Sequence, residues 1–90
     1  EKLEEAKSKY QEMLEIYQKL GNQGRVILAY NNIGDVELKQ NKPLQALENL
    51  KIGHRSALEL DSPEYIEMTA RTIAGIYAAL DSSEIAEEYY

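Results

Sequence analysis

Hydrophobic residues recur along this chain at spacings of three and four, which is the period of an amphipathic α-helix. One stripe covers residues 3–20 and a second covers 26–36, followed by stripes at 44–60 and 66–80. A fifth stripe begins at Ile85 and continues to the last residue. No stretch alternates with the two-residue period of a half-buried strand. The pattern therefore predicts an all-α protein of about five helices without a sheet.

Residues that favour helix ends lie between these stripes. Gly21 and Asn41 tolerate the left-handed conformation that ends a helix. Pro43 and Pro63 suit the first turn of a helix. Ser62 is a natural N-cap, and the run 81–84 (Asp-Ser-Ser-Glu) can cap a further helix. The expected helices are 2–20, 24–40, 43–60, 63–80 and 82–90. Connections this short force neighbouring helices to run antiparallel.

An internal repeat relates these helices. A shift of 40 places Ala6 on Ala46 and then on Ala86. The same shift, which we call one repeat, places Gly34 on Ala74. Two helices approach closely only where small residues meet, so we expect Gly34 to face Ala46, with Leu50 beside them. Ala74 and Ala86 are expected to form the equivalent contact one repeat later. The alternative is a plain helical bundle with a few small core residues.

Composition and charge remove several classes of function. The chain has no Cys and one His, which excludes disulfides, Cys-based zinc sites and a Cys nucleophile and leaves little for a metal. The net charge of −6 lies in the last thirty residues, with −2 over 61–80 and −4 over 81–90. Such a chain has no electrostatic footprint for nucleic acid or anionic lipid. We expect no cofactor, no bound metal, no membrane span and a cytoplasmic location.

Catalytic arrangements are also missing from the sequence. His54 and Ser56 are two residues apart on one expected helix, so their side chains point in different directions. The Gly-containing run at 21–24 lacks the Lys-Ser/Thr that completes a phosphate-binding loop. We therefore interpret His54 as a half-exposed or hydrogen-bonded helix residue and expect no enzymatic activity. Four Tyr residues on the apolar stripes are expected to be mostly core: Tyr10, Tyr17, Tyr30 and Tyr77.

The small and aromatic positions resemble the tetratricopeptide repeat family, in its longer form. That family places a bulky residue, a small residue and an aromatic on helix A, and further small and aromatic residues on helix B. The matching positions in this chain are Tyr30, Ile33, Gly34, Ala46, Leu50 and Gly53, then Ile73, Ala74, Tyr77, Ala86 and Tyr90, with Ala6, Tyr10 and Met13 upstream. The resemblance implies an α-solenoid of antiparallel helix-turn-helix repeats.

The same resemblance divides the chain into parts. Residues 1–22 correspond to helix B of a preceding repeat, 23–62 to one full repeat, and 63–90 to a second, truncated repeat. Taken this way, the chain is a slice of a longer array rather than a finished domain.

Ligand-contacting side chains in this family come from the concave face of the A helices. On this sequence those positions are Leu28, Asn31, Asp35, Leu38 and Lys39, with counterparts at Met68, Arg71, Gly75, Ala78 and Ala79. Asn31 can hydrogen-bond a peptide backbone, and Arg71 can hold a carboxylate with two hydrogen bonds. Asn32 is expected to serve packing between repeats instead. The resemblance thus implies a protein- or peptide-binding scaffold.

Two other functions remain open at this point. The repeats could belong to a larger bacterial regulator and bind a signalling peptide. They could also form a purely structural segment that self-associates through its truncated repeat ends.

Overall fold

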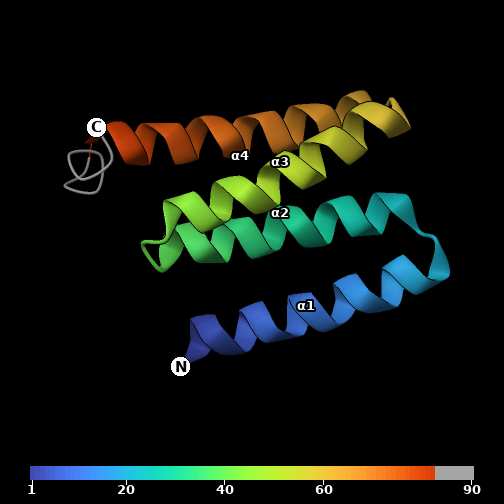
Figure 1. Ribbon diagram of the computed structural model, residues 1–90, viewed down its shortest axis with the longest axis horizontal. Helices are drawn as coiled ribbons and strands as arrows, with labels where there is room; N and C mark the ends of the chain where they lie inside the picture. The colour runs from blue at the N-terminus through green and yellow to red at the C-terminus, as the bar shows by residue number, and fades with distance from the viewer. Residues whose placement is uncertain (83–90) are drawn as a thin grey trace.

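The computed structural model describes residues 1–82, which form four helices: α1 (Lys2–Leu20), α2 (Gln23–Lys39), α3 (Pro43–Leu60) and α4 (Pro63–Ser82). Consecutive helices run in opposite directions and are joined by short turns (Figure 1). No strand occurs within residues 1–82. The predicted all-α class and the antiparallel course of neighbouring helices are therefore confirmed for this part of the chain.

The first three helices begin and end within one residue of the predicted positions. The fourth does not, because α4 continues through Asp81 to Ser82 where the sequence predicted a break. Asp and Ser in a helix each lower its stability by less than about 1 kcal/mol relative to Ala. A sequence that can cap the next helix therefore does not force the preceding helix to end. The structure thus has four described helices, not five. The rest of the predicted fifth helix, 83–90, lies outside the described residues.

The turns before α2 and α4 have matching geometry. Gly21 ends α1 in the left-handed conformation with φ 69°, and Asp61 ends α3 in the same way with φ 56°. The next residue caps the following helix in both cases: the Asn22 side chain accepts a hydrogen bond from the Arg25 N–H, and the Ser62 hydroxyl accepts one from the Tyr65 N–H. As a result, the starts of α2 and α4, at Gln23 and Pro63, are separated by one repeat.

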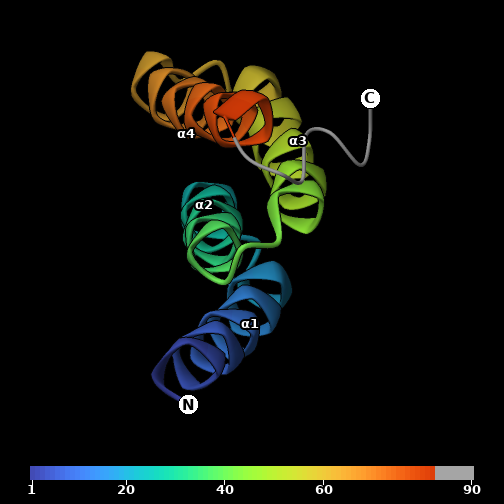
Figure 2. The ribbon, with the colours of Figure 1, turned by 90° about the vertical axis from the view of Figure 1, so that its left-hand side faces the viewer.

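The helices are stacked in chain order. Viewed along the helices, α2 and α4 lie side by side, α3 covers the line between them, and α1 lies at the opposite edge (Figure 2). Helix α2 packs against all three others, whereas α1 packs against α2 alone among the described helices. Helix α1 accordingly contains no buried residue. The core lies between α2, α3 and α4.

The closest helix crossing joins α2 and α3 at the predicted small residues. A Cβ atom on Gly34 would overlap the Leu50 side chain and would lie 3.3 Å from the carbonyl oxygen of Ala46. Gly53 lies similarly close to the Tyr30 side chain, because its Cβ would be 3.1 Å from the Tyr30 Cβ. The predicted contact of Gly34 with Ala46 and Leu50 is confirmed. Its expected counterpart, Ala74 with Ala86, extends beyond the described residues.

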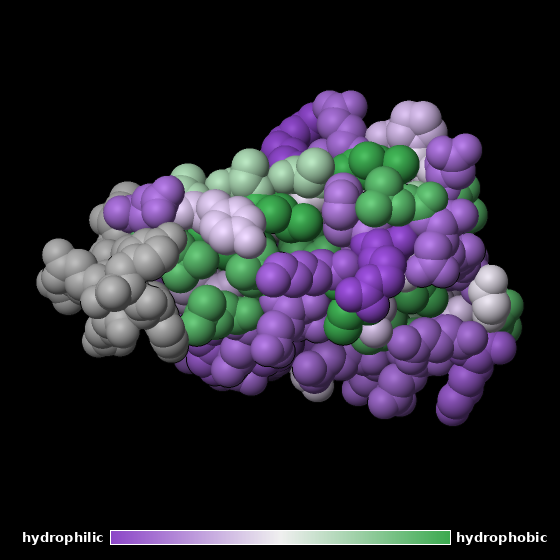
Figure 3. Space-filling view, turned by 45° about the horizontal axis from the view of Figure 1, so that its top comes forward, coloured by the Kyte–Doolittle hydropathy of each residue, from purple (hydrophilic) through white to green (hydrophobic). Residues whose placement is uncertain are grey.

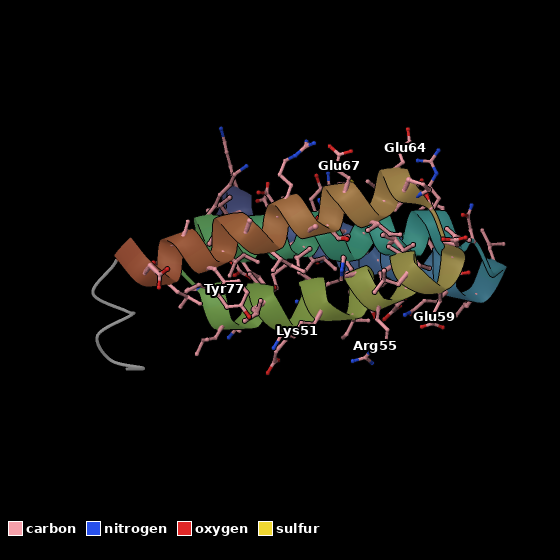
Figure 4. The ribbon with its side chains drawn as sticks, turned by 90° about the horizontal axis from the view of Figure 1, so that it is seen from above. Lys51, Arg55, Glu59, Glu64, Glu67 and Tyr77 are labelled. Atoms are coloured by element: carbon pink, nitrogen blue, oxygen red, sulfur yellow. The ribbon has the colours of Figure 1, made fainter. Side chains whose placement is uncertain are left out.

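A cluster of buried aliphatic side chains joins α3 and α4. Its members are Ala46, Leu47, Leu50, Ile76 and Leu80, with Leu38 and Ile73 packed against them. Tyr77 is not part of this core, although the sequence predicted it there, and its residue surface is 45% exposed. It lies along α4 on the side toward α3 in the view of Figure 4. The described helices leave almost half of it open to solvent.

Candidate functional site

A shallow, open hollow with a cavity volume of about 20 Å³ lies between α1 and α2. We call it the α1–α2 hollow. Aromatic and aliphatic side chains dominate its lining, and one cation and one amide complete it: Tyr10, Met13, Tyr17, Arg25, Leu28, Ala29 and Asn32. A concave, mostly apolar surface with a few polar groups is typical of a ligand site.

Helical spacing brings these side chains together. Tyr10, Met13 and Tyr17 follow one another at intervals of three and four, so they share one face of α1. On α2, the lining residues between Arg25 and Asn32 follow the same intervals and share one face of the helix. Because α1 and α2 are antiparallel, the two faces form opposite walls of the hollow.

Polar contacts hold the two helices together beside the hollow. The buried carboxylate of Glu37 on α2 lies 3.1 Å from the Lys7 ammonium of α1, and it accepts a 2.6 Å hydrogen bond from the Asn49 amide of α3. Gln40 donates a hydrogen bond to the carboxylate of Glu4, which ties the end of α2 to the beginning of α1. A buried carboxylate with both a cation and an amide partner fixes the relative position of three helices.

Arg25 supplies the only positive charge in the lining of the hollow. Its side chain is exposed and forms no ion pair or hydrogen bond within residues 1–82. A guanidinium can bind a carboxylate through two parallel hydrogen bonds. The hollow therefore suits an apolar group that carries, or lies next to, an acid.

The predicted concave-face residues on α2 lie in different environments. Leu28 lines the hollow. The Oδ1 atom of Asn31 is buried and has no hydrogen-bond partner, and Asn32 lines the hollow instead. The two amides lie in different environments because adjacent helix positions differ in direction by about 100°. Leu38 packs against the α3–α4 core cluster and is committed to folding contacts.

The charged candidates pair with neighbours on their own helices. Asp35 and Lys39 form an ion pair of 3.2 Å on α2, and Arg71 pairs with Glu67 on α4. All four side chains are at least half exposed, so these pairs contribute little stability and are free to exchange for a partner's groups. Glu67 points away from α3, together with Glu64 (Figure 4).

The candidates on α4 lie apart from the hollow. Gly75 is exposed, with nothing within 4 Å of where its Cβ would be, and Met68 is half-buried. Ala78 is exposed and Ala79 is half-buried. Helix α4 packs against α2 but not against α1 within the described residues, so the α4 candidates do not line the α1–α2 hollow. The α1 wall of the hollow was not predicted from the sequence. The signal for it is the apolar stripe of α1, which is wider than one neighbouring helix can cover.

His54 has a structural partner. Its Nδ1 atom lies 2.7 Å from the hydroxyl of the buried Thr69, which joins α3 to α4. The Thr69 hydroxyl also donates to the Tyr65 carbonyl at 2.9 Å, and because a hydroxyl carries one proton, His54 is then the donor of the first bond. The expectation of a hydrogen-bonded helix residue is confirmed. Within residues 1–82 no group of three acidic or His side chains is placed to hold a metal ion.

No protein-family model, curated protein or solved structure matches this chain. None of the four described helices combines the length and the apolar character that a membrane span requires.

Proposed function

We propose that this chain is a non-catalytic binding module for a protein or peptide segment, built from helix-turn-helix repeats of the tetratricopeptide type. The observation that carries the proposal is the α1–α2 hollow, an open and mostly apolar surface with a cation that has no ion-pair partner within residues 1–82. Its walls are two helices whose relative position is fixed by a buried ion pair.

The repeat architecture is supported by positions along the chain. Helices α2 and α4 begin one repeat apart, at Gln23 and Pro63, after turns of the same geometry, and they lie side by side. Gly34, the glycine of α2 that permits the closest crossing, corresponds one repeat later to Ala74 of α4. Stacking of this kind makes each unit depend on its neighbours and leaves an extended surface for a ligand.

The proposed ligand is a segment with a large apolar side chain beside a carboxylate. The apolar group would displace water from Tyr10, Met13 and Leu28, which is favourable by about 25 cal/mol per Å² buried. The carboxylate would pair with Arg25 at the rim and fix the direction of the segment. Because the walls are preformed helices, little receptor ordering opposes binding.

Selection from a random peptide library displayed on phage tests this proposal. We expect enriched peptides to combine an apolar anchor with an acidic residue, and calorimetry should show at least tenfold weaker binding to Leu28→Asp and Arg25→Glu. Ile52→Glu is the matched control, because Ile52 is exposed on α3 and does not line the hollow. Peptides that bind all three variants as tightly as the parent chain would contradict the proposal, as would the absence of any enrichment.

A further inference from the structure

Glu37 of α2 is the only charged residue within residues 1–82 that is buried, with 3% of its surface exposed. Elsewhere hydrophilic side chains lie on the outside and predominate toward the lower edge of Figure 3, whereas hydrophobic ones gather where α4 and α3 lie. A carboxylate that leaves water is costly unless partners replace its hydration. Glu37 has two such partners, and they come from two other helices.

Each oxygen of the Glu37 carboxylate has its own partner. Oε2 lies 3.1 Å from the Lys7 Nζ of α1, and Oε1 accepts a 2.6 Å hydrogen bond from the Asn49 Nδ2 of α3. The Lys7 side chain is only 17% exposed and Asn49 is half-buried, so solvent ions screen these contacts weakly. None of the three residues lines the α1–α2 hollow. They are set back from the surface that a ligand would contact.

The hollow lies between two points at which α1 is held to α2. One point is the short turn at Gly21, which joins the two helices. The other is the pair of Lys7 and Glu37, about 20 Å from that turn along α1. The α1 wall of the hollow comes from the stretch between these points: Tyr10, Met13 and Tyr17. The turn and the ion pair together therefore set how far this wall stands from α2.

The ion pair also selects one placement of α1. Apolar contacts are not directional, so the apolar stripe of α1 by itself permits small rotations and shifts on α2. A shift by one helical turn, or the matching rotation, would replace Lys7 by a residue three or four positions away. None of those residues is a cation: Leu3, Glu4, Tyr10 and Gln11. Only the observed placement gives the buried carboxylate a positive partner.

We propose that Glu37 is a positioning residue for the α1–α2 hollow, which holds α1 at the separation from α2 that ligand binding requires. This inference rests on the proposed function and deepens it by naming residues that control the site without contacting the ligand. Asn49 holds Glu37 from the side of α3. Binding at the hollow therefore depends on a residue of a helix that does not line it.

Spin-label distances test the position of α1 without any ligand. The full chain has no Cys, so Glu12→Cys on α1 and Lys51→Cys on α3, both at exposed positions, provide one label on each helix. Adding Glu37→Gln removes the charge and keeps the size, and it should broaden the distance distribution or shift its mean by about 2 Å. Glu67→Gln is the matched control, because it makes the same change in an exposed ion pair on α4 and should leave the distribution unchanged.

Calorimetry with the peptides selected against the parent chain tests the consequence for binding. Glu37→Gln and Lys7→Met should each weaken binding about tenfold, and Asn49→Ala about threefold, because the α1 wall moves. Glu67→Gln should bind like the parent. Circular dichroism identifies the folded variants, and only these are compared. Lys7→Met carries the test if Glu37→Gln does not fold.

Exchange of the two charges provides a rescue. Lys7→Glu alone places two carboxylates together and should weaken binding more than Lys7→Met does. Combining it with Glu37→Lys restores an ion pair, and the Asn49 amide can turn its oxygen toward the new ammonium group. This double variant should therefore bind more tightly than Lys7→Glu. Failure of the folded double variant to recover affinity would overturn the positioning role.

The inference and the proposed function fail in different ways. Unchanged label distances in folded Glu37→Gln, or peptide affinities of Glu37→Gln and Lys7→Met within about twofold of the parent, would overturn the positioning role alone. A parent chain that binds no peptide would overturn the peptide-binding function. The label distances would then still decide whether Glu37 positions α1.

Discussion

Helices α1 and α3 occupy matching positions one repeat apart, yet one is buried and the other is not. Helix α3 has six buried residues because α2 and α4 both pack against it. Helix α1 has none, because only α2 contacts it among the described helices. Both carry apolar stripes of similar length. The apolar stripe therefore indicates which residues of a helix can be buried. The helices that pack on each side determine which of them are buried.

Among the described helices, only α2 packs on α1, and the proposed function depends on the side of α1 that this leaves open. Tyr10 and Met13 lie where α3 has Leu50 and Gly53, which are covered by α2. On α1 the same positions face the hollow and solvent. Differences in packing between regions of the molecule can be measured by matched substitutions, and we expect two results.

The largest effect on stability should come from truncating the side chains at two positions one repeat apart, Tyr10 in α1 and Leu50 in α3. Leu50 is fully buried, so Leu50→Ala should lower the free energy of unfolding by about 2 to 5 kcal/mol. Tyr10 is half-buried against one neighbour, and Tyr10→Ala should cost about 1 kcal/mol. Urea unfolding followed by circular dichroism measures both. Equal losses would mean that α1 is packed as α3 is, and would contradict the comparison.

Substitution of two mid-helix glycines by Ala should change the free energy of unfolding by smaller amounts, with opposite signs. Gly34→Ala forces a methyl group into Leu50 and toward the Ala46 carbonyl, so we expect a net loss of about 1 to 2 kcal/mol. Gly75 has open space beside it, and Gly75→Ala should gain up to about 1 kcal/mol through helix propensity alone. Thermal and urea unfolding of the two variants decide the sign. A stabilising Gly34→Ala would show that the crossing is not tight.

The helix positions could be predicted because their signals are local. Gly21, Pro43 and Pro63 determine where helices end or begin through their own backbone preferences. The tight contact of Gly34 with Ala46 followed from the internal repeat and the size of the residues. The break expected near Asp81 failed because a polar residue permits a helix end without requiring one.

The site was harder to predict because it depends on which neighbours are present. Asn31 and Asn32 are chemically identical, and the placement of α1 against α2 decides which of them lines the hollow. Glu37 reads from the sequence as one more acid, but in the fold it is buried between Lys7 and Asn49 from two other helices. Such partners are distant in sequence and carry no shared local pattern.

The most direct test of the open α1 side is native-state hydrogen exchange of the full chain. At about 10 μM, amides of α1 should exchange at least tenfold faster than those of α3, because α1 opens without disturbing the core. Equal protection of α1 and α3 would contradict the account.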